Sequence, residues 1–193
     1  MNYKSIANPA EGQYKDRGSK FLAYAFPVSD VNEVKGILDA LKKEHHAARH
    51  HCYAYRVGPT GEEWRANDDG EPSGSAGRQI LASIDSAGLS DVLIVVVRYF
   101  GGILLGVPGL IKAYRESSAQ SLANAITIEK TATRLHALHF KYEQMSQVRN
   151  LLKSIPGATI TGQTLELECD LTVAVPLSDC EAFVKLFEKY IKN

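Results

Sequence analysis

Two short polar stretches hold the residues whose types and spacing are best suited to chemistry. DDGEPSGSAG (68–77) contains three carboxylates, two hydroxyls and three glycines, and VVVRYFGGILLG (95–106) contains an arginine, an aromatic pair and three more glycines. Glycine lets the backbone approach a bound anion closely, and the N-terminus of a helix favours negative charge. The two stretches therefore predict either tight turns that connect strands and helices or a site that binds an anion.

The first stretch leads into an expected helix at 78–88. We expect the amides of Ser75, Ala76 and Gly77 to point outward there, with the helix dipole behind them. Arg78 adds a planar guanidinium group that suits phosphate. The alternative is a turn that only caps the helix.

The second stretch contributes Arg98 at the end of an apolar strand. A buried guanidinium needs a partner, so we expect Arg98 to contact a carboxylate of 68–71 or to open toward a shared cleft. A plain salt bridge at the sheet end is the alternative. The candidate anion-binding or nucleic-acid-binding residues are Ser73, Ser75, Gly77, Arg78, Arg98, Gly101, Gly102, Lys112 and Arg115, with His51, Asp68, Asp69 and Glu71 in support.

Metal and catalytic motifs are weaker. Asp69 and Glu71 are the candidate ligands for Mg²⁺, although neighbours such as Asp68 and Asp69 point to opposite sides of an extended chain. His46 and His50 are four residues apart but lack further zinc ligands, which favours surface histidines. No G-x-S-x-G motif is present. We therefore predict no cofactor, with Mg²⁺ as an open option, and favour a function other than catalysis.

Composition limits the classes of partner. The chain has 193 residues with 22 basic and 22 acidic side chains, and residues 1–130 (15 of each) and 131–193 (7 of each) balance separately. This disfavours a general nucleic-acid coat, which needs excess basic charge. No apolar run approaches the roughly 20 residues that span a membrane, and the start lacks the pattern of a secretory signal. Three cysteines without a C-x-x-C pair fit a reducing cytoplasm.

Hydrophobic periodicity predicts an α+β protein with two domains, 1–130 and 131–193. The run of consecutive aliphatic residues that includes Leu93 to Val97, within 91–100, indicates a strand that is buried on both faces and lies between helices. The other strands expected in the first domain lie at 19–28, 51–58 and 63–68, and its helices at 29–46, 78–88 and 109–126. In the second domain we expect a strand at 134–142, a helix at 143–155, two strands within 158–176 that turn around Gly162-Gln163, and a helix at 177–193.

Three segments together carry a family resemblance: ARHHCYAYRVG (48–58), DDGEPSGSAGRQIL (68–81) and VVVRYFGGILLGVPGLIKAY (95–114). With them the chain resembles the IMPACT/YigZ family strongly from residue 1 to about 127. Residues 134–192 are similar to the small C-terminal domain of bacterial members. The chain departs from the usual family pattern at Ser75, where threonine is common, at Gln79, where proline is frequent, and at Val107-Pro108, where Thr-Gly is usual.

The resemblance implies a first domain like domain 2 of ribosomal protein S5 and a ferredoxin-like second domain. This pair looks like the last two domains of elongation factor G, which contact the ribosome. Eukaryotic members are linked to control of translation initiation through a protein partner, whereas bacterial members have no settled activity. Similarity at the level of the fold is only an analogy for function.

The favoured interpretation is a cytoplasmic, translation-associated protein that binds structured RNA or the ribosome, without membrane attachment. A Mg²⁺-dependent enzyme acting on a nucleotide or small phosphorylated ligand is the first alternative. A protein-interaction module is the second. Neutral charge favours the two alternatives, and the family resemblance favours translation.

Overall fold

The computed structural model describes residues 1–191, and these form two compact units. The first unit runs from Tyr3 to Lys130, and the second joins Met1–Asn2 with the chain from Thr131 onward. Each unit has its own apolar core.

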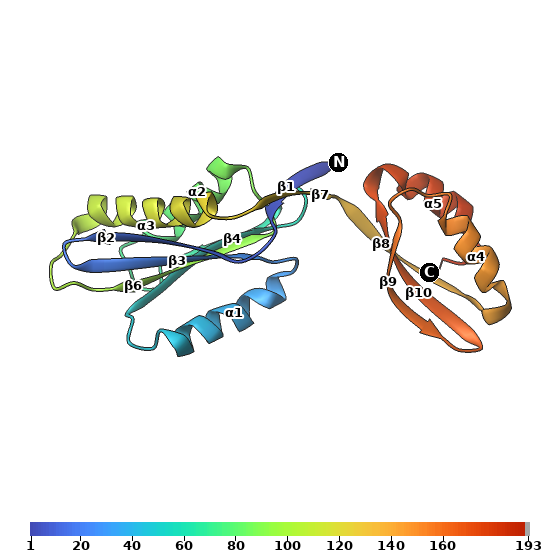
Figure 1. Ribbon diagram of the computed structural model, residues 1–193, viewed down its shortest axis with the longest axis horizontal. Coiled ribbons are helices and arrows are strands. Elements are labelled where there is room, and N and C mark those ends of the chain that lie inside the picture. The colour runs from blue at the N-terminus through green and yellow to red at the C-terminus, as the bar shows by residue number, and fades with distance from the viewer. Residues whose placement is uncertain (192–193) are drawn as a thin grey trace. The chain divides into compact units, whose positions relative to one another are not determined.

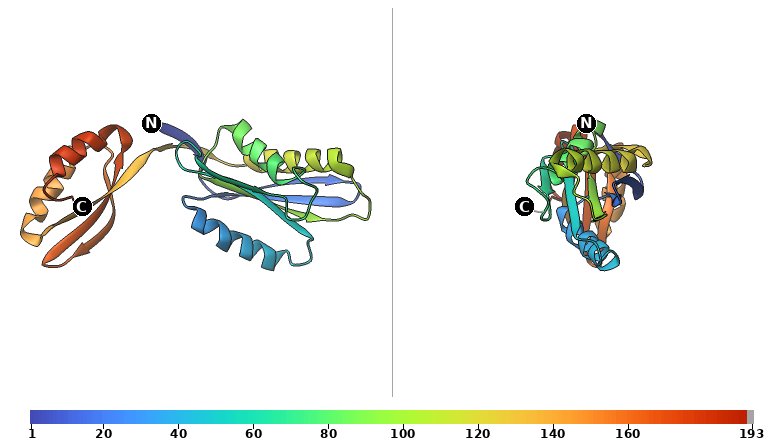
Figure 2. Two further views of the ribbon diagram at one scale, coloured as in Figure 1. Left: turned by 180° about the vertical axis from the view of Figure 1, so that it is seen from behind. Right: turned by 90° about the vertical axis from the view of Figure 1, so that its left-hand side faces the viewer.

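A five-stranded antiparallel sheet forms the centre of the first unit, in the order β2-β3-β6-β4-β5. One face is covered by α2 and α3 and the other by α1 (Figures 1 and 2). The strands are β2 (Ala10–Asp16), β3 (Ser19–Pro27), β4 (His50–Val57), β5 (Glu63–Asn67) and β6 (Val92–Tyr99), and the helices are α1 (Val31–Glu44), α2 (Gly77–Ala87) and α3 (Gly106–Ala123).

The central strand β6 confirms the prediction of burial on both faces. Every residue from Val92 to Arg98 is buried. Ile94 and Val96 belong to the core beneath α2 and α3, whereas Leu93 and Val95 belong to the core beneath α1. Side chains alternate along a strand, so only a strand that is apolar at every position can supply both cores.

Local signals set the ends of α1 and α2 close to the predicted ranges, 29–46 and 78–88, whereas α3 begins and ends three residues earlier than the predicted 109–126. Asp30 accepts a hydrogen bond from the Asn32 amide, and Glu33 accepts from the Asp30 amide, which together form a capping box at the start of α1. Gly88 ends α2 in the left-handed conformation. Three strands were not predicted: β2, and the separate pair formed by β1 (Asn2–Ile6) and β7 (Thr127–Thr131), whose end residues Asn2 and Thr131 belong to the second unit.

The second unit has the predicted β-α-β-β-α order. Its antiparallel sheet has the strand order β8-β10-β9. Ile191 adds an isolated bridge to Leu138. The elements are β8 (Thr133–Lys141), α4 (Met145–Leu152), β9 (Thr159–Leu165), β10 (Glu168–Pro176) and α5 (Cys180–Phe187), with single 3₁₀ turns at Tyr142–Gln144 and Leu177–Asp179.

The turn predicted at Gly162-Gln163 is wrong. Both residues lie inside β9, where Gly162 pairs with Thr172 of β10 beside a shift in register. The chain reverses after Leu165 instead, before Glu168 begins β10. Burial of alternate residues of β10 in the core sets the pairing, and it outweighs the local turn preference of glycine. The predicted helix at 177–193 ends at Phe187, and 192–193 lie outside the described residues.

Within the described part of the chain, no helix combines the length and the apolar character needed to cross a membrane.

Candidate functional site

The Arg98 pocket is a cavity of about 440 Å³ in the first unit. It is bounded by the start of β4, the end of β6, the loop 68–77, the turn between β6 and α3, and the start of α3. Its lining residues are Arg49, His50, Glu71, Pro72, Arg98, Phe100, Leu104, Leu105, Gly106, Val107 and Leu110.

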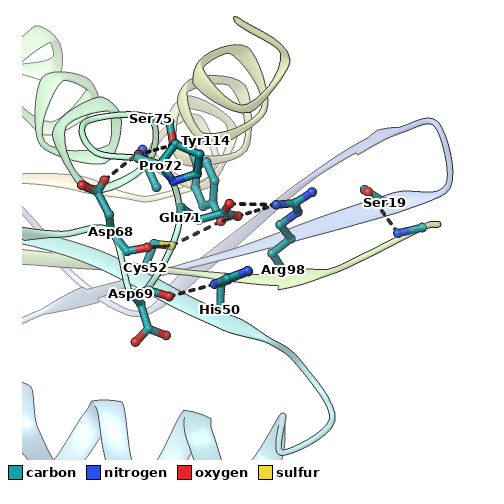
Figure 3. A network of polar contacts seen from close by, with 12 residues as sticks. Ser19, His50, Cys52, Asp68, Asp69, Glu71, Pro72, Ser75, Arg98 and Tyr114 are labelled. Carbon is teal, nitrogen blue, oxygen red and sulfur yellow. Dashed lines mark hydrogen bonds and ion pairs between the residues drawn. The ribbon is translucent and has the colours of Figure 1, made fainter. Parts of the chain in front are cut away.

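A buried ion pair forms the polar side of this pocket. Arg98 Nη1 donates to both Glu71 carboxylate oxygens, at 2.6 and 2.9 Å. The two side chains are only 7% and 3% exposed, respectively. The contact predicted between Arg98 and the acidic stretch is therefore confirmed, with Glu71 as the partner (Figure 3).

Tyr114 and Cys52 extend the pair into a buried polar network. The Tyr114 hydroxyl donates to Glu71 Oε1 at 2.7 Å. The Cys52 sulfur lies 3.3 Å from that hydroxyl and 3.0 Å from the Asp68 carbonyl oxygen. Burial raises the pKa of the Cys52 thiol and of the Tyr114 phenol. Both groups therefore keep their protons at neutral pH, and the network joins β4, β6 and α3 to the loop.

Asp68 occupies the amides that the sequence suggested for an external anion. Its carboxylate accepts hydrogen bonds from the backbone amides of Gly74 (2.8 Å), Ala76 (3.1 Å) and Gly77 (2.8 Å). The prediction that the amides at the start of α2 point outward is therefore wrong at Ala76 and Gly77. The chain's own carboxylate is tethered beside them, so it fills the positive end of the helix without a ligand.

Ser75 is also directed inward. The residue is fully buried, its hydroxyl donates to the Pro72 carbonyl at 2.6 Å, and its amide donates to the same oxygen at 2.9 Å. Gly101, in the second stretch, donates its amide to the Ser19 hydroxyl at 3.1 Å. The Ser75 hydroxyl and the Gly101 amide therefore stabilise turns. Gly101 and Gly102 are both exposed.

Asp69 and the two histidines of β4 are arranged by strand alternation. The His51 amide donates to the Asp69 carboxylate at 2.7 Å, and His50 Nδ1 donates to the Asp69 carbonyl at 2.8 Å. His50 lines the Arg98 pocket, but the His51 ring lies on the opposite face of β4, the face that Tyr53 shares with the core beneath α1. Burial lowers the pKa of His51. Its support of the loop therefore comes from the backbone alone.

The remaining predicted cations lie outside the Arg98 pocket. Arg78 is exposed on α2 and lines a second cavity of about 370 Å³ with Trp64, Ser73 and Asp68. Arg115 donates to the Gln79 side chain at 2.6 Å. Lys112 is exposed on α3 and lines neither cavity. The second cavity is also lined by Ala66, Gly74 and Leu81.

The loop 68–77 separates these two cavities. It contributes Glu71 and Pro72 to the Arg98 pocket, and Asp68, Ser73 and Gly74 to the cavity beside Arg78. The candidate residues therefore line separate cavities. Arg115 lines a third cavity, of about 700 Å³, and of the two beside the loop the Arg98 pocket is the larger.

The candidate magnesium ligands are not brought together. Glu71 is paired with Arg98 and Tyr114, while the Asp69 carboxylate accepts from the His51 amide. Among residues 1–191, no three histidine, cysteine, aspartate or glutamate side chains are grouped so that they could hold a metal ion. Asp69 and Glu71 therefore hold the loop 68–77 in place through their contacts with β4, β6 and α3.

Sequence reasoning missed three pocket residues. Arg49 and Phe100 adjoin the motifs but were not selected, and His50 was assigned to the surface. The Phe100 ring lies near two guanidinium groups, with its centroid 5.7 Å from the Arg98 Cζ and 6.0 Å from the Arg49 Cζ. The signal available in the sequence was period-two alternation, which places His50 and Cys52 on the same face of β4.

The fold and the residues around this pocket belong to a class of α/β protein that carries an Impact N-terminal domain. The family model of that domain matches residues 17–122. The chain belongs to the IMPACT family. It is 34% identical over 167 residues to the IMPACT family member YigZ of Escherichia coli, an alignment that covers 86% of this chain and 81% of the relative. The family member YvyE of Bacillus subtilis is also 34% identical, over 79% of this chain and 70% of its own length.

A crystal structure of a protein described as hypothetical shares this fold. The TM-score is 0.76 at 30% sequence identity, and the match covers 99% of this chain and 95% of the other. The likeness therefore extends over both units.

Proposed function

We propose that this protein acts in translation by binding structured RNA or the ribosome, with the Arg98 pocket as a principal contact. Membership of the IMPACT family supports a role in translation, because eukaryotic members are linked to control of initiation. The protein would work in the cytoplasm, where its three buried, unpaired cysteines would remain reduced. A protein partner in translation control is compatible with the same role.

The finer fold assignment belongs to this proposal. The first unit would correspond to domain 2 of ribosomal protein S5, and the second to a ferredoxin-like domain. The β-α-β-β-α order with the middle position taken by β10 supports the second assignment. The pair would then resemble the last two domains of elongation factor G.

The observation that carries the proposal is the gathering of two guanidinium groups and an imidazole beside an exposed aromatic ring. Arg49, His50 and Arg98 line one pocket with Phe100. Glu71 balances the Arg98 charge, so the uncompensated positive charge comes from the exposed Arg49. A local contact of this kind needs no excess of basic residues over the whole chain, which is formally neutral.

Ribosome binding tests this function. Sedimentation with purified ribosomes and anisotropy with ribosomal RNA fragments should show binding that weakens from 50 to 200 mM salt, roughly as expected for a few phosphate contacts. Arg49→Ala should weaken binding by about fivefold to tenfold and reduce the salt slope by about one. Arg65→Ala is the matched control, because Arg65 is exposed on β5 and lines neither cavity.

Arg98→Ala is a poor test, because it leaves Glu71 buried without its cation and is expected to destabilise the fold by about 3–5 kcal/mol. Absence of binding to ribosomes and ribosomal RNA at 50 mM salt would contradict the proposal. Equal losses in Arg49→Ala and Arg65→Ala would remove the Arg98 pocket from it.

One observation favours a protein-interaction module as the second candidate. The turn between β6 and α3 exposes Ile103 and Leu104, the start of α3 exposes Val107, and Leu104 is 81% exposed. Exposed apolar side chains that are close in the sequence are typical of a surface that binds a partner protein. Ile103→Ser would then abolish capture of a protein partner while RNA binding stays unchanged, because Ile103 is exposed and lines neither cavity.

A further inference from the structure

We propose that the Arg98 pocket takes a single unpaired nucleotide from an RNA loop, with the base inside the pocket and its phosphate at the mouth. This inference rests on the proposed RNA-binding function and specifies how the RNA is recognised. The pocket volume of about 440 Å³ lies within the range of cavities that hold small ligands.

The two sides of the pocket match the two parts of a nucleotide. Leu104, Leu105, Val107 and Leu110 form an apolar wall, while Arg49 and His50 belong to the polar side, where Arg49 carries the positive charge. A nucleotide likewise combines a flat base, whose faces favour apolar and aromatic surroundings, with an anionic phosphate. Duplex RNA hides the faces of its bases by stacking, so only an unpaired base can enter.

Phe100 supplies the surface on which the base would stack. Its ring is 42% exposed and lies at the border between the apolar wall and the guanidinium groups of Arg49 and Arg98. Aromatic rings and guanidinium planes are the groups on which proteins stack the bases of single-stranded RNA. A fully apolar peptide would leave the cationic side without a partner.

The buried ion pair sets the orientation. The Glu71 carboxylate lies at the polar side and would repel a phosphate brought deep into the pocket. Arg49 is exposed and is the cation available at the mouth. Arg98 is held on Glu71 through Nη1, and its buried Nε has no hydrogen-bond partner. The arrangement therefore favours a neutral polar base edge inside and the phosphate outside.

His50 adds a specific acceptor. Its Nδ1 must carry the proton, because it donates to the Asp69 carbonyl. In the neutral ring Nε2 is then an acceptor, which suits the exocyclic amine of adenine or cytosine. The pocket should consequently prefer these bases to uracil.

The experiment compares two RNAs of equal length by fluorescence anisotropy: a hairpin with an unpaired adenine-rich loop, and a blunt duplex. The wild-type chain should bind the hairpin at least tenfold more tightly. Phe100→Ala should weaken hairpin binding by about fivefold to 100-fold and leave duplex binding unchanged. Phe100→Tyr, which keeps the ring, should restore it.

Trp64→Ala is the matched control, because Trp64 is an exposed aromatic residue that lines the other cavity. Circular dichroism of each variant verifies the fold. Equal affinity for hairpin and duplex, or a hairpin affinity unchanged by Phe100→Ala, would overturn the inference while the RNA-binding function stands. Failure of the wild-type chain to bind either RNA or ribosomes would overturn the proposed function and the inference with it. An apolar peptide that competes fully with the hairpin would also overturn the inference.

Discussion

The Asp68 side chain occupies the backbone amides of the loop 68–77 that could otherwise bind an anion. Its carboxylate accepts three backbone amides of residues 74–77, and its carbonyl oxygen lies beside the Cys52 sulfur. The loop is thereby anchored at one end by Asp68 and, three residues later, by Glu71 on Arg98. An external phosphate would have to displace a tethered carboxylate, which makes these amides structural groups.

Replacing Asp68 should destabilise the first unit. Asp68→Ala removes a charged acceptor from three amides, and we expect a loss of about 2–3 kcal/mol in the free energy of unfolding. Asp68→Asn should cost less, since the amide oxygen still accepts. Urea denaturation followed by Trp64 fluorescence gives the values.

Asp39→Ala serves as the control, because Asp39 is exposed on α1 and should change stability by less than about 0.5 kcal/mol. If Asp68→Ala were no worse than Asp39→Ala, the carboxylate would not be holding the loop.

At the scale of elements, the turn between β6 and α3 is positioned by close backbone contact. A Cβ atom at Gly101 would lie 2.0 Å from the Gly18 carbonyl carbon and 2.2 Å from the Ser19 nitrogen, in the turn that joins β2 to β3. Gly102 differs: its φ of +88° is left-handed, but no atom lies within 4 Å of the site of a Cβ. Glycine is needed for space at the first position and for conformation at the second.

The two glycines should therefore respond differently to alanine. Gly101→Ala must separate the two turns, and we expect it to cost more than about 3 kcal/mol and to weaken RNA binding through the neighbouring Phe100. Gly102→Ala should cost about 1–2 kcal/mol, the penalty of a left-handed alanine. Thermal unfolding of both variants measures the difference, and equal costs would show that the close contact is not decisive.

At the scale of the whole molecule, the two units have separate cores of different size. The first unit packs apolar residues on both sides of β6, whereas the second packs α4 and α5 against one face of a three-stranded sheet. A domain of about 60 residues buries a smaller fraction of its surface and is correspondingly marginal. We propose that the first unit is an independent domain that carries the RNA contact.

Expression of residues 3–130 alone tests this proposal. We expect a cooperative thermal transition, dispersed amide resonances and the same preference for an unpaired RNA loop as the full chain, because the Arg98 pocket lies within this range. Residues 131–193 alone should unfold at a lower temperature. A fragment 3–130 without a cooperative transition would contradict the independence of the first unit.

Features that depend on neighbouring residues or on a regular period could be predicted from the sequence. The apolar run predicted a strand with two buried faces, periodicity predicted helices at 29–46 and 78–88 close to the observed α1 and α2, and the β-α-β-β-α order followed from the second half. Contact of Arg98 with the acidic stretch was also foreseeable, since a buried charge requires a counter-ion.

Which groups face one another depends on how the strands and helices pack. Asp68 turns to its own loop amides, and His50 rather than His51 enters the pocket, because a strand sends adjacent side chains to opposite faces and the packed layers decide which face is which. Pairing of β1 with β7 joins residues more than a hundred positions apart. Such contacts depend on how surfaces fit after the chain has folded, and local sequence preferences do not contain that information.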